Sequence, residues 1–313
     1  MTISENHAPK VAPIFAALIL VFGCSMSAQQ KEIPRAELIT RVTNAYPAYS
    51  PDAKRVAYMS NADGDFDIYV RTLGEQVVQK LTDAPGQDGT PVWSPDGSKI
   101  AFRSMRDGRS QVYVMNADGS DQRNLSNNKY NDEHPFWSAD GKRILFCSDR
   151  TTPAGAKDRN YDIFEMEADG GHVRQITHTP EIETYPSWSP DGSKIACRKI
   201  MPDGDWEIVV MDRDGSNPKN ISNHKGFDGW GVWSPDGKWI AYSSEIGETM
   251  RIFLVRPDGS GKRQITDDDR ATEDRQPSWH PGGSFLLFAR YQWFQGQAWY
   301  EASEIYATRV DQD

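Results

Sequence analysis

The 313-residue chain contains few of the side chains from which metal and nucleophile sites are usually built, with three cysteines and six histidines. No two cysteines have the spacing of a zinc site. Cys147 and Cys197 lie in apolar segments, where a free cysteine packs as a small hydrophobic residue, and we expect no disulfide between them. The sequence has no His-x-x-x-His pair and no Gly-x-Ser-x-Gly segment. These absences exclude a zinc-peptidase motif and the nucleophile elbow of a serine hydrolase.

The chain also lacks a cluster of basic residues. Its 35 lysines and arginines are outnumbered by 45 acidic residues, which gives a formal net charge of −10. Nucleic-acid binding normally requires a basic patch, so we expect no nucleic-acid partner. The acidic balance favours solubility and suits cationic partners, but it does not identify one.

Long apolar runs are missing as well. The run of residues 11–23 is too short to span a membrane comfortably. It follows Lys10 and ends at Cys24, an order that resembles a bacterial export signal. The four residues that end in Cys24 resemble the lipobox of bacterial lipoproteins, which predicts a lipid on that cysteine as the only membrane contact. The alternative is plain secretion with cleavage near Ala28.

One phrase recurs six times in the rest of the sequence. Trp-Ser-Pro-Asp-Gly occurs three times in full and three times in degraded form, and its anchoring aromatics are Tyr49, Trp93, Trp137, Trp188, Trp233 and Trp279. These anchors are 44 to 51 residues apart. A repeat of this length is typical of a propeller or a solenoid. Because the tryptophans recur at one structural position, we interpret them as packing residues.

Each repeat predicts four antiparallel strands. In the second repeat, the segments 90–94, 99–104, 111–115 and 123–126 have the composition of strands, and turn sequences separate them. Four strands in about 45 residues make one propeller blade. The sequence therefore predicts an all-β fold, a six-bladed β-propeller of four-stranded antiparallel blades.

The last repeat ends before a fourth strand. Residues 37–40 are similar to residues 264–266, which form the fourth strand of the preceding repeat. We therefore expect the N-terminal strand to join the last blade and close the ring, because closure removes exposed sheet edges. The predicted organisation is an export signal over 1–24, a polar tether over 25–35 and the propeller over 36–313.

The phrase, the Ile-Ala-Phe and Asp-Ile-Tyr-Val strands after it and the Asp-Gly-Ser turns together resemble the TolB-like β-propeller family. The resemblance covers residues 36–313 through all six repeats. It implies a six-bladed propeller and work in the periplasm as part of a cell-envelope protein complex. TolB itself has an additional N-terminal α/β domain. We do not expect that domain here, because the export signal leads almost directly into the first blade.

Five carboxylates and one amide stand five residues before the anchors: Asn44, Asp88, Asp132, Glu183, Asp228 and Asp274. They begin the innermost strands, so we expect them around the mouth of the central channel. Converging carboxylates repel one another unless a cation or donors compensate them, and oxygen ligands suit Ca²⁺ or another divalent cation. The predicted metal ligands are Asp88, Asp132, Glu183, Asp228 and Asp274. The alternative is that each carboxylate caps backbone N–H groups in its own loop.

A second set stands three residues before the anchors: Tyr46, Thr90, His134, Tyr185, Trp230 and Gln276. Aromatic side chains there either bind a sugar or a peptide, or pack between blades. The last repeat also inserts the aromatic-rich segment 291–303, which is either a recognition loop or a cover for the last blade junction. The predicted ligand-binding residues are Tyr46, His134, Tyr185, Trp230, Trp293, Phe294 and Trp299.

Two functions are consistent with these patterns. The first is an exported, non-catalytic propeller, either periplasmic or lipid-anchored. It would bind an envelope protein or a glycan at the channel mouth, where acidic and aromatic residues gather. The alternative is a metal-dependent carbohydrate-active enzyme, a lyase or a hydrolase, in which His134 and Asp132 carry the chemistry. Propellers that resemble this one and act as polysaccharide lyases hold their metal among several histidines, whereas this ring has one. Fold alone does not separate binding from catalysis.

Overall fold

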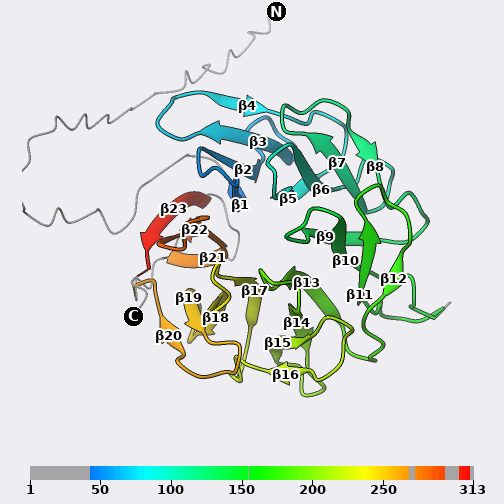
Figure 1. Ribbon diagram of the computed structural model, residues 1–313, viewed down its shortest axis with the longest axis vertical. Coiled ribbons are helices and arrows are strands. Elements are labelled where there is room, and N and C mark those ends of the chain that lie inside the picture. Colours follow the sequence, from blue (N-terminus) through cyan, green and yellow to red (C-terminus); the bar gives the residue numbers. More distant parts are fainter. Residues whose placement is uncertain (1–42, 154, 268–271, 293–302, 311–313) are drawn as a thin grey trace, which may run out of the picture. The chain divides into compact units, whose positions relative to one another are not determined.

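The structure, a computed structural model, describes residues 43–153, 155–267, 272–292 and 303–310. In this part of the chain every regular element is a β-strand, and the strands form six sheets that stand in a ring (Figure 1). The predicted six-bladed, all-β propeller is confirmed. Among the described residues no helix is long and apolar enough to cross a membrane.

The six blades follow one another along the chain. Blade 1 contains β1 (Asn44–Tyr49), β2 (Arg55–Ser60), β3 (Asp67–Thr72) and β4 (Val78–Lys80). Blade 2 contains β5 (Asp88–Trp93), β6 (Lys99–Ser104), β7 (Gln111–Asn116) and β8 (Arg123–Asn124). Blade 3 contains β9 (Asp132–Trp137), β10 (Arg143–Ser148), β11 (Asp162–Glu167) and β12 (Arg174–Gln175).

The second half of the ring repeats this arrangement. Blade 4 contains β13 (Glu183–Trp188), β14 (Lys194–Ile200), β15 (Trp206–Asp212) and β16 (Lys219–Asn220). Blade 5 contains β17 (Asp228–Trp233), β18 (Ile240–Ile246), β19 (Thr249–Val255) and β20 (Arg263–Gln264). Blade 6 contains β21 (Thr272–Trp279), β22 (Phe285–Gln292) and β23 (Ser303–Arg309).

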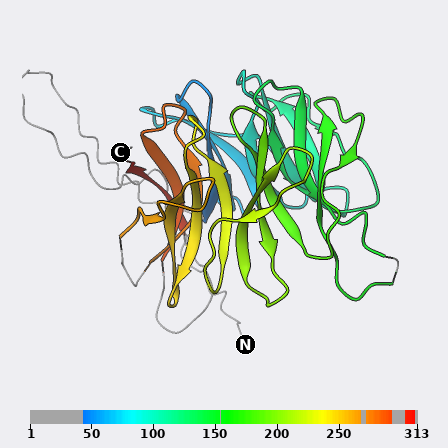
Figure 2. The same cartoon turned by 60° about the horizontal axis from the view of Figure 1, so that its bottom comes forward.

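The strand pairing fixes which loops share a face of the ring. Within each blade consecutive strands pair antiparallel, from the innermost to the outermost strand. The turns after the first and third strands therefore lie on one face, which we call the turn face. The loops after the second strands and between blades lie on the other face, which we call the loop face. Figure 2 shows the blades from the side, with their strands running between these two faces.

The ring closes where blade 6 meets blade 1. The strands β21, β22 and β23 pack against β1, and Ser303 Oγ donates a hydrogen bond of 2.6 Å to the Asn44 carbonyl oxygen. A shared apolar cluster that includes Tyr58, Leu287 and Ile305 fills this junction. The strand predicted over residues 37–40 lies outside the described residues, so its role in closure stays a prediction.

The repeated tryptophans are packing residues, as the sequence predicted. Trp93, Trp137, Trp188, Trp233 and Trp279 are between 3% and 8% exposed, and each belongs to an apolar cluster. The indole N–H of Trp93 donates to the Ala48 carbonyl oxygen of the preceding blade over 3.1 Å. The Trp279 indole N–H donates in the same way to the Val232 carbonyl oxygen, also over 3.1 Å. The repeated tryptophans therefore join neighbouring blades mainly through apolar burial, and at Trp93 and Trp279 also through a hydrogen bond.

The rest of the phrase builds a turn. Ser94 Oγ donates to Asp96 Oδ1 over 2.6 Å, the Ser98 backbone N–H donates to the same oxygen, and Gly97 takes a φ of 70° that suits glycine. These hydrogen bonds lower the pKa of Asp96 to about 2, because they stabilise its charged form. The repeated residues of the phrase thus build the turns on the turn face, and a binding site is expected in another part of the ring.

Candidate binding site at the channel mouth

The carboxylates at the start of the innermost strands are buried in ion pairs inside their own blades. Their exposed fractions are 0% or 1%. Four of them face a basic side chain from the same blade, at nitrogen–oxygen distances of 2.6 to 3.0 Å: Asp88–Arg106, Asp132–Arg150, Glu183–Lys199 and Asp274–Arg290. Each pair compensates a charge that would otherwise be costly to bury.

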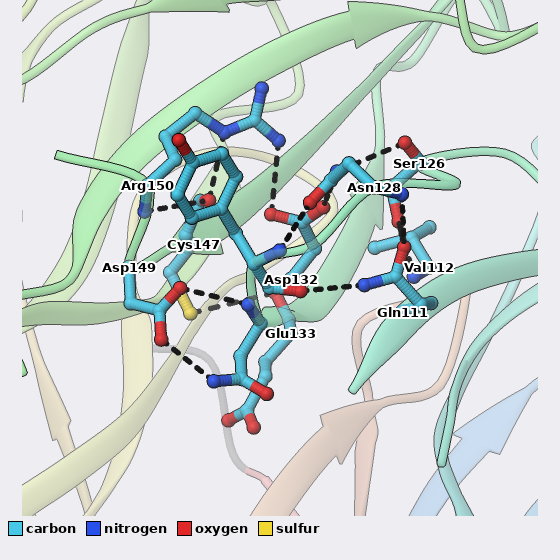
Figure 3. A network of polar contacts seen from close by, with 12 residues as sticks. Gln111, Val112, Ser126, Asn128, Asp132, Glu133, Cys147, Asp149 and Arg150 are labelled. Carbon is cyan, nitrogen blue, oxygen red and sulfur yellow. Dashed lines mark hydrogen bonds and ion pairs between the residues drawn. The ribbon is translucent and has the colours of Figure 1, made fainter. Parts of the chain in front are cut away.

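Figure 3 shows how completely one of these carboxylates is enclosed. Asp132 accepts from Arg150 Nη2 over 3.0 Å at one oxygen and from Asn128 Nδ2 over 2.5 Å at the other. Asn128 is itself held by Gln111 Oε1 through its backbone N–H. Both oxygens of the side chain therefore have partners, one from blade 3 and one from the loop that links blades 2 and 3.

Asp228 is the exception among the five. It is fully buried, and no lysine or arginine nitrogen of the described residues lies within 4.0 Å of it. Burial raises its pKa, while the Ser244 and Ser222 hydroxyls act in the opposite direction. Across the described part of the chain no three histidine, cysteine or acidic side chains are grouped closely enough to hold a metal ion. The structure thus does not bring the predicted metal ligands together.

The residues three positions before the anchors do converge. Each takes a left-handed backbone conformation, with φ between 51° and 59°, at an irregularity in the pairing of the innermost strand: Tyr46, Thr90, His134, Tyr185, Trp230 and Gln276. Such conformations are uncommon for residues other than glycine. All six line one cavity of about 150 Å³ in the central channel. The repeated bulge therefore aims one side chain from every blade at the axis of the ring.

Two of these side chains meet across the channel. The Tyr46 and Tyr185 hydroxyls lie 2.7 Å apart, and they come from blades 1 and 4, which stand on opposite sides of the ring. The His134 ring lies 3.5 Å from the Tyr185 ring, between centroids, and Trp230 packs edge-on against the same tyrosine at 5.9 Å. We call Tyr46, His134, Tyr185 and Trp230 the channel plug.

The chemistry of His134 is suppressed by this packing. Burial, together with the nearby positive charges of Arg198 and Arg103, lowers the pKa of its imidazole well below the ordinary value. Its Nδ1 lies 3.2 Å from the Cys147 sulfur, and burial raises the pKa of that thiol well above its ordinary value. The lowered pKa disfavours the imidazolium form that acts as a general acid, and the raised thiol pKa disfavours the nucleophilic thiolate.

An open pocket of about 430 Å³ lies beside the plug on the loop face. Blades 4, 5 and 6 contribute its lining: Arg198, Phe227, Trp230, Glu245, Glu248, Thr249, Met250, Glu273 and Arg275. Trp230 belongs to both the plug and this pocket, so the pocket adjoins the plug. We call it the mouth pocket.

Arg198 is the central side chain of the mouth pocket. Its guanidinium carbon lies 4.4 Å from the Trp206 ring, 4.6 Å from Tyr185 and 5.6 Å from Phe227. Its Nε donates to Thr184 Oγ1 over 3.0 Å. The side chain is thus stacked against three rings, and burial lowers its pKa from the ordinary value for arginine.

A profile described as the TolB beta propeller domain matches residues 35–156 and 150–299 of the sequence. The chain belongs to this family. No curated protein matches the sequence significantly.

Several solved structures are similar to this chain in fold. A putative TolB from Agrobacterium tumefaciens is 21% identical with a TM-score of 0.64, over 86% of this chain and 91% of that one. TolB from Acinetobacter baumannii is 20% identical with a TM-score of 0.61, over 87% of this chain and 64% of that one. An oligogalacturonate lyase in complex with manganese is 16% identical with a TM-score of 0.58, over 87% of this chain and 90% of that one. At such identities these likenesses show the fold alone.

Within this TolB-family propeller, the sequence identified part of the site and missed part. Tyr46, His134, Tyr185 and Trp230 were predicted and lie together in the plug, whereas Trp293, Phe294 and Trp299 lie outside the described residues. Tyr291, which precedes them, is buried and has the Arg275 guanidinium carbon 5.3 Å from its ring. The loop predicted over 291–303 therefore starts beside the mouth pocket.

Arg198, Trp206 and Phe227 were missed. The signal available was a departure from the repeat, since β14 carries the two basic residues Arg198 and Lys199 where other blades carry one or none.

Proposed function

We propose that this chain is an exported, non-catalytic propeller of the bacterial envelope that binds a protein or glycan partner at the mouth pocket. The observation that carries the proposal is the composition of that pocket. An open cavity of about 430 Å³ combines the aromatic side chains of Phe227 and Trp230 with charges of both signs. Aromatic and arginine side chains dominate the energetics of protein interfaces, and aromatic faces also stack on sugars. Trp230, which also belongs to the plug, would form the part of the wall nearest the channel.

The alternative, a metal-dependent carbohydrate-active enzyme built on His134 and Asp132, has weaker support. His134 is packed against Tyr185 and held neutral, and Asp132 is occupied by Arg150 and Asn128. Both oxygens of Asp132 are thus already bonded within the protein, and His134 would have to act from its uncharged form.

Export remains part of the proposal through the sequence of residues 1–24. Mass spectrometry of the mature protein from a bacterial envelope fraction tests it directly. A lipid-modified Cys24 at the new N-terminus supports anchoring, and cleavage near Ala28 supports plain secretion. An unprocessed chain in the cytoplasm would refute export.

The binding proposal is tested by capture from envelope extracts with charge-reversed variants. Glu248 is an exposed residue of the mouth pocket, and Glu75 is an exposed residue in the turn between β3 and β4 on the turn face. We expect Glu248→Arg to reduce the recovery of a specific partner at least tenfold, and the matched Glu75→Arg variant to leave recovery unchanged. Equal recovery by both variants, or no recovery above an unrelated propeller, would overturn the proposal.

A further inference from the structure

Arg198 is a largely buried cation without a counter-ion. Among the described residues no carboxylate oxygen lies within 4.0 Å of its guanidinium, and its Nε donates a hydrogen bond to Thr184 Oγ1. The two terminal nitrogens are thus left for the mouth pocket, of which Arg198 is a lining residue. Burial of a cation is costly unless a partner compensates it.

Several other basic side chains near this face of the ring are paired with carboxylates. Lys199, the next residue on β14, lies 3.0 Å from Glu183 and 3.3 Å from Glu181. Arg106 and Arg150 are paired with Asp88 and Asp132 in the same way. Each of these cations is therefore paired with a carboxylate of its own blade, whereas Arg198 lies beside an open cavity with no carboxylate oxygen of the described residues within 4.0 Å.

The space around Arg198 is shaped for its side chain. Gly229 lies opposite, and a Cβ there would stand 3.4 Å from Arg198 Cδ and 2.7 Å from a Phe227 ring carbon. The missing side chain lets the arginine stem and the ring lie flat against β17. The stacking on Trp206, Tyr185 and Phe227 then orients the guanidinium. Because the arginine side chain is already ordered, binding of a ligand costs less conformational entropy.

The rim of the pocket has the opposite charge. Glu245 accepts from the Phe227 backbone N–H over 3.0 Å, and Glu248 is exposed. Glu273 is paired with Arg275 at 2.5 Å. A polyanion would be repelled by this acidic rim. A ligand with a single anionic group flanked by N–H donors would be favoured, because the anion would meet Arg198 and the donors would meet the rim carboxylates.

We infer that the mouth pocket recognises a carboxylate of an extended peptide, bound by the Arg198 guanidinium, with the peptide N–H groups directed at Glu245 and Glu248. A guanidinium fork matches a planar carboxylate with two parallel hydrogen bonds. The inference rests on the proposed function, since it names the chemical class of the partner for the same pocket. The carboxylate belongs either to a free chain end or to an acidic side chain.

The test uses the full mature protein on a solid support and three N-acetylated random hexapeptide pools. The first pool has free C-terminal carboxylates and contains no Asp or Glu. The second is the same pool as C-terminal amides. The third is amidated and has one Glu at its centre. Retention of each pool is quantified by mass spectrometry, and inorganic phosphate at matched ionic strength serves as a competitor.

We expect at least one carboxylate pool to be retained about 30-fold or more over the plain amide pool, the ratio expected for a desolvated charge pair. Retention of the first pool identifies a chain end, and retention of the third identifies an acidic side chain. Equal retention of all three pools would overturn the inference. So would complete competition by phosphate at a concentration at which acetate has no effect.

Variants connect the preference to Arg198. Arg198→Gln should lower the retention of the carboxylate pool to that of the plain amide pool. Arg198→Lys should keep only a small part of the preference for the carboxylate pool, because a lysine lacks the planar fork. Arg256 is the matched control, since its guanidinium carbon is also stacked on a tryptophan, 4.5 Å from Trp239, but on the turn face. Arg256→Gln should retain the full ratio. A wild-type ratio in folded Arg198→Gln would refute the role of this arginine.

The two proposals fail in different ways. If a specific envelope partner is captured equally well by wild type and by Arg198→Gln, the carboxylate inference is wrong and the binding function stands. If no partner depends on the mouth pocket, but the peptide pools still separate, the pocket recognises carboxylates and the proposed envelope function is wrong.

Discussion

Two neighbouring residues on β14 show how this propeller separates architecture from recognition. Lys199 reaches Glu183 at 3.0 Å and neutralises a carboxylate that is 1% exposed. Arg198, one residue earlier, points to the other side of the strand and lies 4.4 Å from the Trp206 ring, with no carboxylate of the described residues within 4.0 Å. The same charge thus serves the blade in one case and faces a cavity in the other.

The largest change in stability is expected from removing the charge of Lys199, the residue that serves the structure of the blade. We expect Lys199→Met to lower the free energy of unfolding by about 3–5 kcal/mol, because Glu183 would stay buried without a cation. Urea denaturation followed by circular dichroism measures the change. A loss below about 1 kcal/mol would show that Glu183 is solvated in the folded ring. The double variant Lys199→Met with Glu183→Gln should recover most of the loss.

A smaller effect is expected in the channel plug. Tyr185→Phe removes the hydroxyl that lies 2.7 Å from the Tyr46 hydroxyl and leaves the ring packing in place. We expect a loss of about 1 kcal/mol in the free energy of unfolding, the usual contribution of one hydrogen bond. Tyr113→Phe is the control, because that hydroxyl bonds Asp107 within blade 2 and not across the ring. An unchanged stability for Tyr185→Phe would mean that the two blades are not coupled through this contact.

Asp228 extends the comparison to a buried acidic group that has no lysine or arginine partner among the described residues. Its folded pKa is raised above the ordinary value of 3.8 by burial, so its contribution to stability is complete below about pH 3.8 and is lost as pH rises through the folded pKa. Asp228→Asn imitates the protonated form and should stabilise the protein by up to about 1 kcal/mol at pH 7. The gain should shrink as the pH approaches 4. Urea midpoints of variant and wild type at both pH values measure it, and a constant difference would contradict this assignment.

The smallest stability change is expected at Arg198 itself. Arg198→Met keeps an unbranched stem against Trp206 and Phe227, and loss of the cation–π contact, about 0.5–2 kcal/mol, is offset by removal of an unpaired buried charge. We expect a net change within about 0.5 kcal/mol of zero in the same urea assay used for Lys199→Met. A loss comparable to that of Lys199→Met would place Arg198 with the structural residues, and would remove the contrast on which the binding inference depends.

The sequence predicted the scaffold well because the scaffold repeats. The segment predicted over 99–104 coincides with β6 (Lys99–Ser104), and the six anchors locate the innermost strand of every blade. Outer strands were less accurate: the segment predicted over 123–126 contributes only Arg123–Asn124 to β8. A two-residue edge strand is defined by its pairing with β7 rather than by its own composition.

The site was harder to predict, because it depends on which way side chains point. The carboxylates before the anchors were correctly singled out as a set, but their partners Arg106, Arg150, Lys199 and Arg290 belong to the ends of the second strands and the loops after them. Nothing in the spacing shows that these residues turn inward. The left-handed conformation at positions such as Thr90 is equally hidden, since a β-branched residue there gives no hint of a positive φ.

The contact between Tyr46 and Tyr185 has a consequence for how a partner would enter and leave. It joins blades 1 and 4 across the axis of the ring, with His134 and Trp230 packed against the same tyrosine. A chain that passed from one face to the other would have to break this contact. Under the proposed binding function, the partner would therefore present a terminus or a protruding loop to the ring and would not thread through it. Release then follows the path of entry, so the lifetime of the complex would be set at a single opening.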